Sequence, residues 1–131
     1  MKYQQREFSE DLLEKIRNTE VALKDHIDRL LLKYKPVFAK KNLDLNAGFY
    51  KEGNDPFMPE YRSSVSIGIA EENEELIDLH TINIWECNRY FLGMPTSKKI
   101  PGSKIIGELL DETIEDVKEE LKEYINDFLE E

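Results

Sequence analysis

The densest group of chemically reactive side chains lies between His80 and Tyr90, where the chain reads His-Thr-Ile-Asn-Ile-Trp-Glu-Cys-Asn-Arg-Tyr. A nucleophilic cysteine needs a general base within hydrogen-bonding distance. On a regular strand His80 and Cys87 point to opposite faces and lie about 20 Å apart, which excludes a local dyad. We therefore expect Cys87 to be a buried structural residue, and the sequence predicts no catalytic residue.

The same segment offers a candidate ligand pocket. By the alternation of a strand, His80 and Glu86 share one face, and with Arg89 nearby they are candidate lining groups of a pocket between a sheet and its helices. An exposed pair of strand side chains is the alternative interpretation. The chain has two histidines and no HxH, HxxxH or CxxC spacing, so we expect no metal site. Gly93 to Lys99 lacks the second glycine of a phosphate loop, and we expect no cofactor.

The strongest electrostatic feature is the C-terminal segment from Glu108 to Glu131. It carries 11 acidic side chains against Lys118 and Lys122, a balance of -9 within a total of -10. Acidic pairs recur there at i,i+4, and each such pair costs a helix about 0.2 to 0.5 kcal/mol before screening by salt. This concentration exceeds what solubility requires.

One interpretation of this acidic segment is a negative field that attracts a basic protein partner. The contact surface would then consist of helix carboxylates, namely Glu112, Glu115, Asp116, Glu119, Glu120, Glu123 and Asp127. The competing interpretation is a solvated helix face. A variant of it has the basic residues of the N-terminal region neutralise the acidic face, internally or across a homodimer.

Three classes of function follow from these features. The leading hypothesis is a small acidic cytoplasmic protein that acts by protein–protein binding, an inhibitor or immunity-type protein that covers a basic site on its partner. The alternatives are a small-molecule-binding domain or simple enzyme that uses the pocket of His80, Glu86 and Arg89, and a structural or assembly subunit. The last would use apolar residues at the edges of the N-terminal helix stripe, namely Leu13, Val21 and Leu31.

The elements that position these residues follow from the periodicity of apolar residues. Helical spacing predicts a long amphipathic helix from Ser9 to about Tyr34, with Ser9 as N-cap and Pro36 as the residue that ends it. Apolar residues then alternate with polar ones in three segments, which predicts strands at 43–49, 64–69 and 79–87, the last with a further stretch to Leu92. No crossover helix separates them, so we expect an antiparallel meander.

The remaining segments complete a predicted α+β architecture. Lys104 to Gly107 is either a fourth strand or part of the final helix, and 51–60 is expected to fold onto the sheet rather than form an exposed patch. The final helix is predicted from Glu112 to Leu129, with a capping box of Thr113 and Asp116. Its apolar stripe faces the sheet and its carboxylates face outward.

Length and composition indicate the number of domains, the disulfide content, the location and the class of partner. The 131 residues suit a single domain covering 1–131, and one cysteine excludes an internal disulfide. We find neither a signal-peptide pattern nor a run of 18 apolar residues, so we expect a cytoplasmic protein with no membrane contact. The net negative charge also argues against nucleic acid as a partner.

Overall fold

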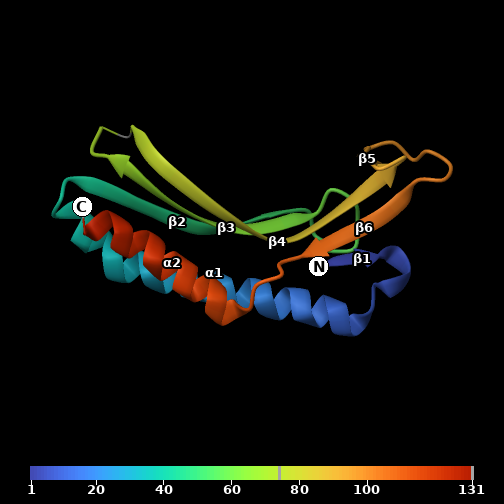
Figure 1. Ribbon diagram of the computed structural model, residues 1–131, viewed down its shortest axis with the longest axis horizontal. Helices are drawn as coiled ribbons and strands as arrows, with labels where there is room; N and C mark the ends of the chain where they lie inside the picture. The colour runs from blue at the N-terminus through green and yellow to red at the C-terminus, as the bar shows by residue number, and fades with distance from the viewer. Residues whose placement is uncertain (74, 131) are drawn as a thin grey trace. The chain divides into compact units, whose positions relative to one another are not determined.

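The computed structural model describes residues 1–73 and 75–130 and has an α+β fold (Figure 1). In chain order its elements are β1 (Lys2–Gln4), the 3-10 helix η1 (Gln5–Glu7), α1 (Glu10–Ala39), β2 (Leu43–Glu52), β3 (Arg62–Glu71), β4 (Leu76–Phe91), β5 (Met94–Pro95), β6 (Lys104–Leu109) and α2 (Ile114–Leu129). The predicted class is confirmed. The sheet has six strands rather than three or four, because β1 and β5 are too short to show an alternating pattern.

The strands form one antiparallel sheet in the order β1-β6-β4-β3-β2, and β5 pairs with the end of β4. The predicted meander is present as β2, β3 and β4. The segment from Lys104, which the sequence left open, is strand β6, and it pairs with β4 from Trp85 opposite Leu109 to Tyr90 opposite Lys104. Strand β1 then pairs with the other edge of β6.

Helix α1 is longer than the sequence predicted. Ser9 accepts a hydrogen bond from the backbone N–H of Leu12 at 3.2 Å, as expected for an N-cap. The prediction that Pro36 ends the helix was wrong, because α1 continues to Ala39 with Pro36 inside it. Proline removes one helical hydrogen bond, but Phe38 in the following turn is fully buried, and this burial holds the last turn in place.

The contacts between residues divide the chain into two compact units. Unit 1 consists of Met1–Glu20, Tyr50–Ser64 and Asn83–Asp111; unit 2 consists of Val21–Phe49, Val65–Ile82 and Glu112–Glu131. Helix α1 and strands β2, β3 and β4 each contribute residues to both units. The expectation of a single domain stays a prediction.

The core of unit 1 is organised around Trp85, which is fully buried. Its indole N–H donates to the carbonyl oxygen of Pro56 at 2.7 Å, and its ring contacts the aromatic rings of Tyr3, Phe8 and Phe57. Phe8 and Phe57 stack at a centroid distance of 4.6 Å. These contacts confirm that the segment 51–60 folds onto the sheet.

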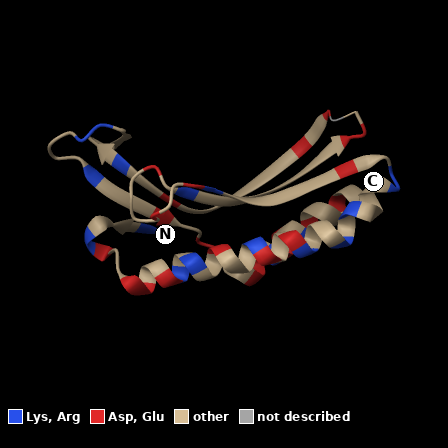
Figure 2. Cartoon of the chain, turned by 180° about the vertical axis from the view of Figure 1, so that it is seen from behind, with Lys and Arg blue, Asp and Glu red and all other residues tan. Residues whose placement is uncertain are grey.

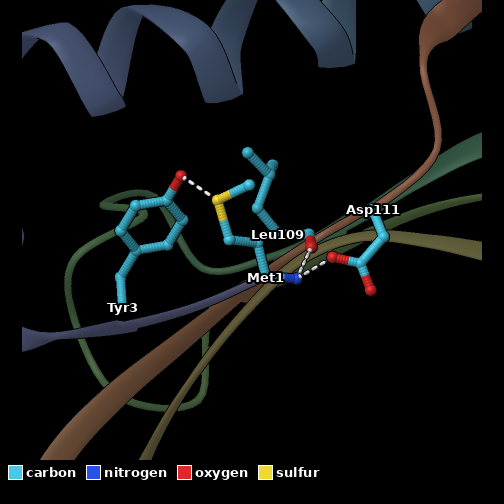
Figure 3. A network of polar contacts seen from close by, with 4 residues as sticks. All are labelled: Met1, Tyr3, Leu109 and Asp111. Carbon is cyan, nitrogen blue, oxygen red and sulfur yellow. Dashed lines mark hydrogen bonds and ion pairs between the residues drawn. The ribbon is translucent and has the colours of Figure 1, made fainter.

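The start of the chain is fixed to the end of β6 in the same unit. The amino group of Met1 donates to the carbonyl oxygen of Leu109 at 2.7 Å and pairs with the carboxylate of Asp111 (Figure 3). The hydroxyl of Tyr3 lies 2.8 Å from the sulfur of Met1. Backbone pairing of β1 is therefore extended by one residue beyond the strand itself.

The core of unit 2 is mainly aliphatic. The second half of α1 and all of α2 lie on the same side of the strands in this unit (Figure 1). Fully or nearly fully buried side chains come from both helices and from the facing strands, namely Leu23, Ile27, Leu30, Leu45, Val65, Ile67, Ile69, Ile82, Val117, Leu121 and Ile125. The packing of α2 on the sheet is as predicted, and it fixes which face of α2 points to solvent.

Candidate functional site

Helix α2 begins where the sequence predicted a capping box. Thr113 accepts a hydrogen bond from the backbone N–H of Asp116 at 3.1 Å, and the carboxylate of Asp116 accepts one from the backbone N–H of Thr113 at 3.3 Å. Val117, Leu121 and Ile125 are buried along one stripe. The helix is therefore held by its cap and by its apolar face, and its rotation is set by these residues.

The carboxylates predicted to form a contact surface lie on α2, away from its buried stripe, except Glu112, which precedes the helix because α2 starts at Ile114 rather than at Glu112. Six of the seven are exposed, namely Glu112, Glu115, Asp116, Glu119, Glu123 and Asp127. Glu120 is half-buried because it faces β4. The structure thus brings the predicted residues together as one acidic surface, called here the α2 acidic face.

Few basic side chains balance this surface. Lys118 pairs with Glu115 at 3.6 Å, and it is the only lysine or arginine of the described residues in an ion pair with an α2 carboxylate. Lys122, three residues after Glu119, forms no ion pair in the described part of the chain. Most of the charge of the α2 acidic face therefore meets solvent.

The basic residues of unit 2 have other partners. Arg29 pairs with Asp25 at 2.9 Å, and Lys35 pairs with Asp44 at 3.1 Å. Lys41 donates to the carbonyl oxygen of Leu129 at 2.9 Å, which is a main-chain contact at the end of α2. Among the described residues of this unit, no ion pair joins the second half of α1 to the α2 acidic face.

Four side chains join α2 to the first part of β4. The Nε2 atom of His80 lies 3.7 Å from Oε1 of Glu120, and its ring stacks on Tyr124 at a centroid distance of 5.5 Å. The hydroxyl of Tyr124 donates to Asp78 at 2.8 Å. His80 was a predicted pocket residue, but here it contacts a helix. Sequence reasoning missed Tyr124 and Asp78, since no local pattern links residues 46 positions apart.

The environment of this region shifts several pKa values. Burial raises the pKa of Tyr124, and the hydrogen bond and charge of Asp78 raise it further. Loss of hydration raises the pKa of Glu112, to which the carboxylates of Glu120 and Asp116 add. Burial lowers the pKa of His26 on α1, followed by the charge of Lys118. Repulsion from neighbouring carboxylates therefore contributes to the raised pKa of Glu112 at the start of α2.

The other two predicted pocket residues lie in unit 1 and point to different places. Glu86 lines a cavity of about 480 Å³ that also includes Lys2, Tyr90, Lys104 and Glu108. Its register partner on β6 is Glu108, which in turn lies opposite Lys2 on β1. Arg89 does not line this cavity. Its guanidinium donates to the hydroxyl of Ser103 at 3.1 Å. The structure thus places Glu86 at this cavity and Arg89 against Ser103, and a pocket shared by His80, Glu86 and Arg89 stays a prediction.

Cys87 is fully buried, as predicted. Burial raises the pKa of its thiol to about 11, and the charge of Asp55 contributes to this shift. A thiol with so high a pKa is a poor nucleophile at neutral pH. The structure therefore gives Cys87 the properties of a packed core residue.

Comparisons with protein-family models, curated proteins and solved structures found no match to this chain. Among the described residues, no group of three or more His, Cys, Asp or Glu side chains has an arrangement that could hold a metal ion. No helix in the part of the chain that the structure describes is long and apolar enough to cross a membrane. The function of the α2 acidic face therefore has to be inferred from its own geometry and charge.

Proposed function

We propose that this protein acts by binding a basic protein partner, as an inhibitor or immunity-type protein that covers a basic site. The α2 acidic face is the proposed contact surface. The observation that carries the proposal is that its carboxylates are held outward by a buried apolar stripe and, among the described residues, have only Lys118 as a paired basic side chain. A surface of this kind speeds the encounter with a basic partner and strengthens the complex at low salt.

The repulsion between neighbouring carboxylates of α2 destabilises the free helix, and this cost supports the same proposal. Four exposed carboxylates, Glu115, Glu119, Glu123 and Asp127, follow one another at i,i+4, so each repels the next. Substitution by neutral residues would relieve this repulsion without touching the buried stripe. A basic partner relieves it on binding, which makes the helix more stable in the complex than in the free protein.

The test compares two variants with the same change in charge. The first neutralises the four carboxylates at i,i+4, with glutamate changed to glutamine and aspartate to asparagine. The control changes four exposed carboxylates of unit 1 to glutamine, namely Glu10, Glu14, Glu52 and Glu60. Both raise the net charge from -10 by four units.

The partner is first captured from a lysate of the source cells at low salt, identified and purified, and its association rate is then measured by stopped flow. We expect a basic partner whose association slows about tenfold or more in the α2 variant and depends less steeply on salt, with the control close to wild type. Equal rates for both variants would show that only overall charge matters. An unchanged rate in the α2 variant would contradict the proposal.

Small-molecule binding is the second candidate function, and the cavity beside Glu86 in unit 1 favours it. Its lining combines carboxylates with Lys2 and Lys104, which suits a ligand with both signs of charge. Thermal-shift screening of zwitterionic metabolites against wild type and Glu86→Gln tests it. A ligand that stabilises both proteins equally would not use this cavity.

A further inference from the structure

Among the residues that the structure describes, no other strand covers one edge of the first part of β4. Strand β4 runs from Leu76 to Phe91, but β6 pairs with it only from Trp85 to Tyr90, and β5 pairs with its last two residues. In unit 2 the residues Leu76 to Ile82 therefore have β3 on one side and, among the described residues, no strand on the other. This stretch is called here the free β4 edge.

The hydrogen-bonding groups at this edge follow from the pairing further along the strand. Leu110 donates its N–H to the carbonyl oxygen of Ile84, so even-numbered residues of β4 point their backbone groups toward β6. Cys87 instead exchanges backbone hydrogen bonds with Glu60 and Tyr61 on the other side. In an antiparallel strand this alternation places the N–H and C=O groups of Asp78, His80 and Ile82 at the free β4 edge.

The side chains near this edge do not protect it. Leu76, Ile77 and Leu79 are 59%, 47% and 57% exposed, respectively. Natural proteins guard an open strand edge with lysine, proline or a bulge that turns the strand away. The stretch from Leu76 to Ile82 contains neither lysine nor proline. It combines unpaired backbone groups with exposed aliphatic side chains, as strand-accepting edges do.

The charge around the free β4 edge determines which segment fits it. Asp78 and His80 contact Tyr124 and Glu120, so Glu120 places one carboxylate of α2 beside this part of β4. Strand β3 ends at Glu71, and the turn that follows it adds Glu72 and Glu75. Figure 2 shows acidic residues in red at this end of β3 and β4. A second copy of this chain would bring an equally acidic surface and be repelled, whereas lysine or arginine side chains would be attracted.

We propose that the free β4 edge accepts an extended basic segment of the partner protein as an additional strand, with its basic side chains toward the carboxylates of α2 and of the β3–β4 turn. This inference rests on the proposed function and specifies how the partner is held. The main chain of the segment supplies hydrogen bonds, its apolar side chains cover Leu76, Ile77 and Leu79, and its charges give selectivity.

The test uses a defined probe rather than the partner. The probe is an acetylated and amidated heptapeptide of alternating lysine and valine, compared with the same peptide methylated at its five central backbone nitrogens. Methylation removes the N–H donors but keeps every charge. We expect the methylated peptide to bind at least about tenfold more weakly by calorimetry, since several backbone hydrogen bonds are lost. We also expect the unmethylated peptide to slow amide exchange at Asp78, His80 and Ile82.

Protein variants give an independent control. Ile77→Lys with Leu79→Lys places like charge beside the edge and should weaken peptide binding about tenfold or more. The matched control is Leu92→Lys with Met94→Lys in unit 1, where both apolar side chains are also exposed and the change in charge is the same. Binding to the control should stay within about twofold of wild type. Equal weakening in both double variants would contradict the proposed edge.

The outcomes separate this inference from the proposed function. If both peptides bind equally and only the neutralised α2 variant loses them, the α2 acidic face binds basic segments but the free β4 edge accepts no strand. If methylation abolishes binding while the α2 variant binds normally, the edge accepts a strand and the proposed role of α2 fails. If neither peptide binds at low salt, or if sedimentation shows self-association through this edge, the inference is overturned.

Discussion

Units 1 and 2 differ in charge and in the nature of their cores. Unit 1 holds 11 acidic and 10 basic residues, whereas unit 2 holds 17 acidic and 8 basic ones. The core of unit 1 contains an indole, a thiol and a buried carboxylate, while that of unit 2 is mainly aliphatic. Polar and aromatic groups in a core need specific partners, whereas aliphatic packing tolerates adjustment. Unit 2 therefore has a tolerant core beneath a strongly charged surface.

The largest expected effect concerns two glycines, one in each unit. A Cβ atom at Gly107 would lie 2.0 Å from the ring of buried Trp85, whereas one at Gly68 would meet the flexible end of Leu79 at 3.1 Å. We expect Gly107→Ala to lower the free energy of unfolding by about 3 kcal/mol or more and Gly68→Ala by less than about 1 kcal/mol. Urea denaturation measures both. Equal losses would remove the proposed difference in tolerance.

A second comparison concerns two tyrosine hydroxyls that donate to carboxylates. Tyr61 donates to buried Glu20 at 2.6 Å in unit 1, and Tyr124 donates to exposed Asp78 at 2.8 Å in unit 2. Tyr61→Phe leaves a buried carboxylate oxygen without its donor and should cost about 1 to 3 kcal/mol. Tyr124→Phe should cost less than about 1 kcal/mol, because water replaces the lost donor. Thermal unfolding followed by circular dichroism distinguishes the two.

The buried thiol of Cys87, in unit 1, makes the stability of the folded protein depend on pH in the alkaline range. Its pKa is raised from 9.0 to about 11 by burial and by Asp55, so the folded protein holds this proton more tightly than the unfolded chain. The contribution is complete below pH 9 and is lost as the pH rises through 11, with a loss of about 2 kcal/mol by pH 11. Stability should therefore fall less steeply in Cys87→Ala than in wild type between pH 8 and 11. Parallel curves would exclude the thiol as the cause.

The smallest expected effect has the opposite sign and belongs to unit 2. Neutralising Glu115, Glu119, Glu123 and Asp127 removes repulsion between exposed carboxylates, and it should stabilise the free protein by about 1 kcal/mol at low salt. The gain should shrink in high salt because ions already screen these charges. The four-residue control in unit 1 should gain nothing. Urea denaturation at two salt concentrations measures the difference, and a loss of stability in the α2 variant would show that its carboxylates have partners.

Local patterns predicted most of the fold. Ser9 and the pair Thr113 and Asp116 cap their helices as expected, because capping depends on residues only three positions apart. The alternation of apolar residues located β2, β3 and β4 for the same reason. Local rules failed at Pro36, where the burial of Phe38 outweighed one missing hydrogen bond, and at β1, which is a strand only because β6 lies beside it.

The sequence by itself determined the class of fold, the burial of Cys87 and the outward position of the carboxylates of α2, since each depends on periodicity within one element. Only the tertiary structure decided which distant side chains meet. It placed Glu86 in a cavity with residues of β1 and β6, brought His80 to Glu120, and, among the described residues, left the first half of β4 without a second neighbouring strand. Those results depend on strand order and register, which arise from contacts between residues far apart in the chain and leave no local pattern in the sequence.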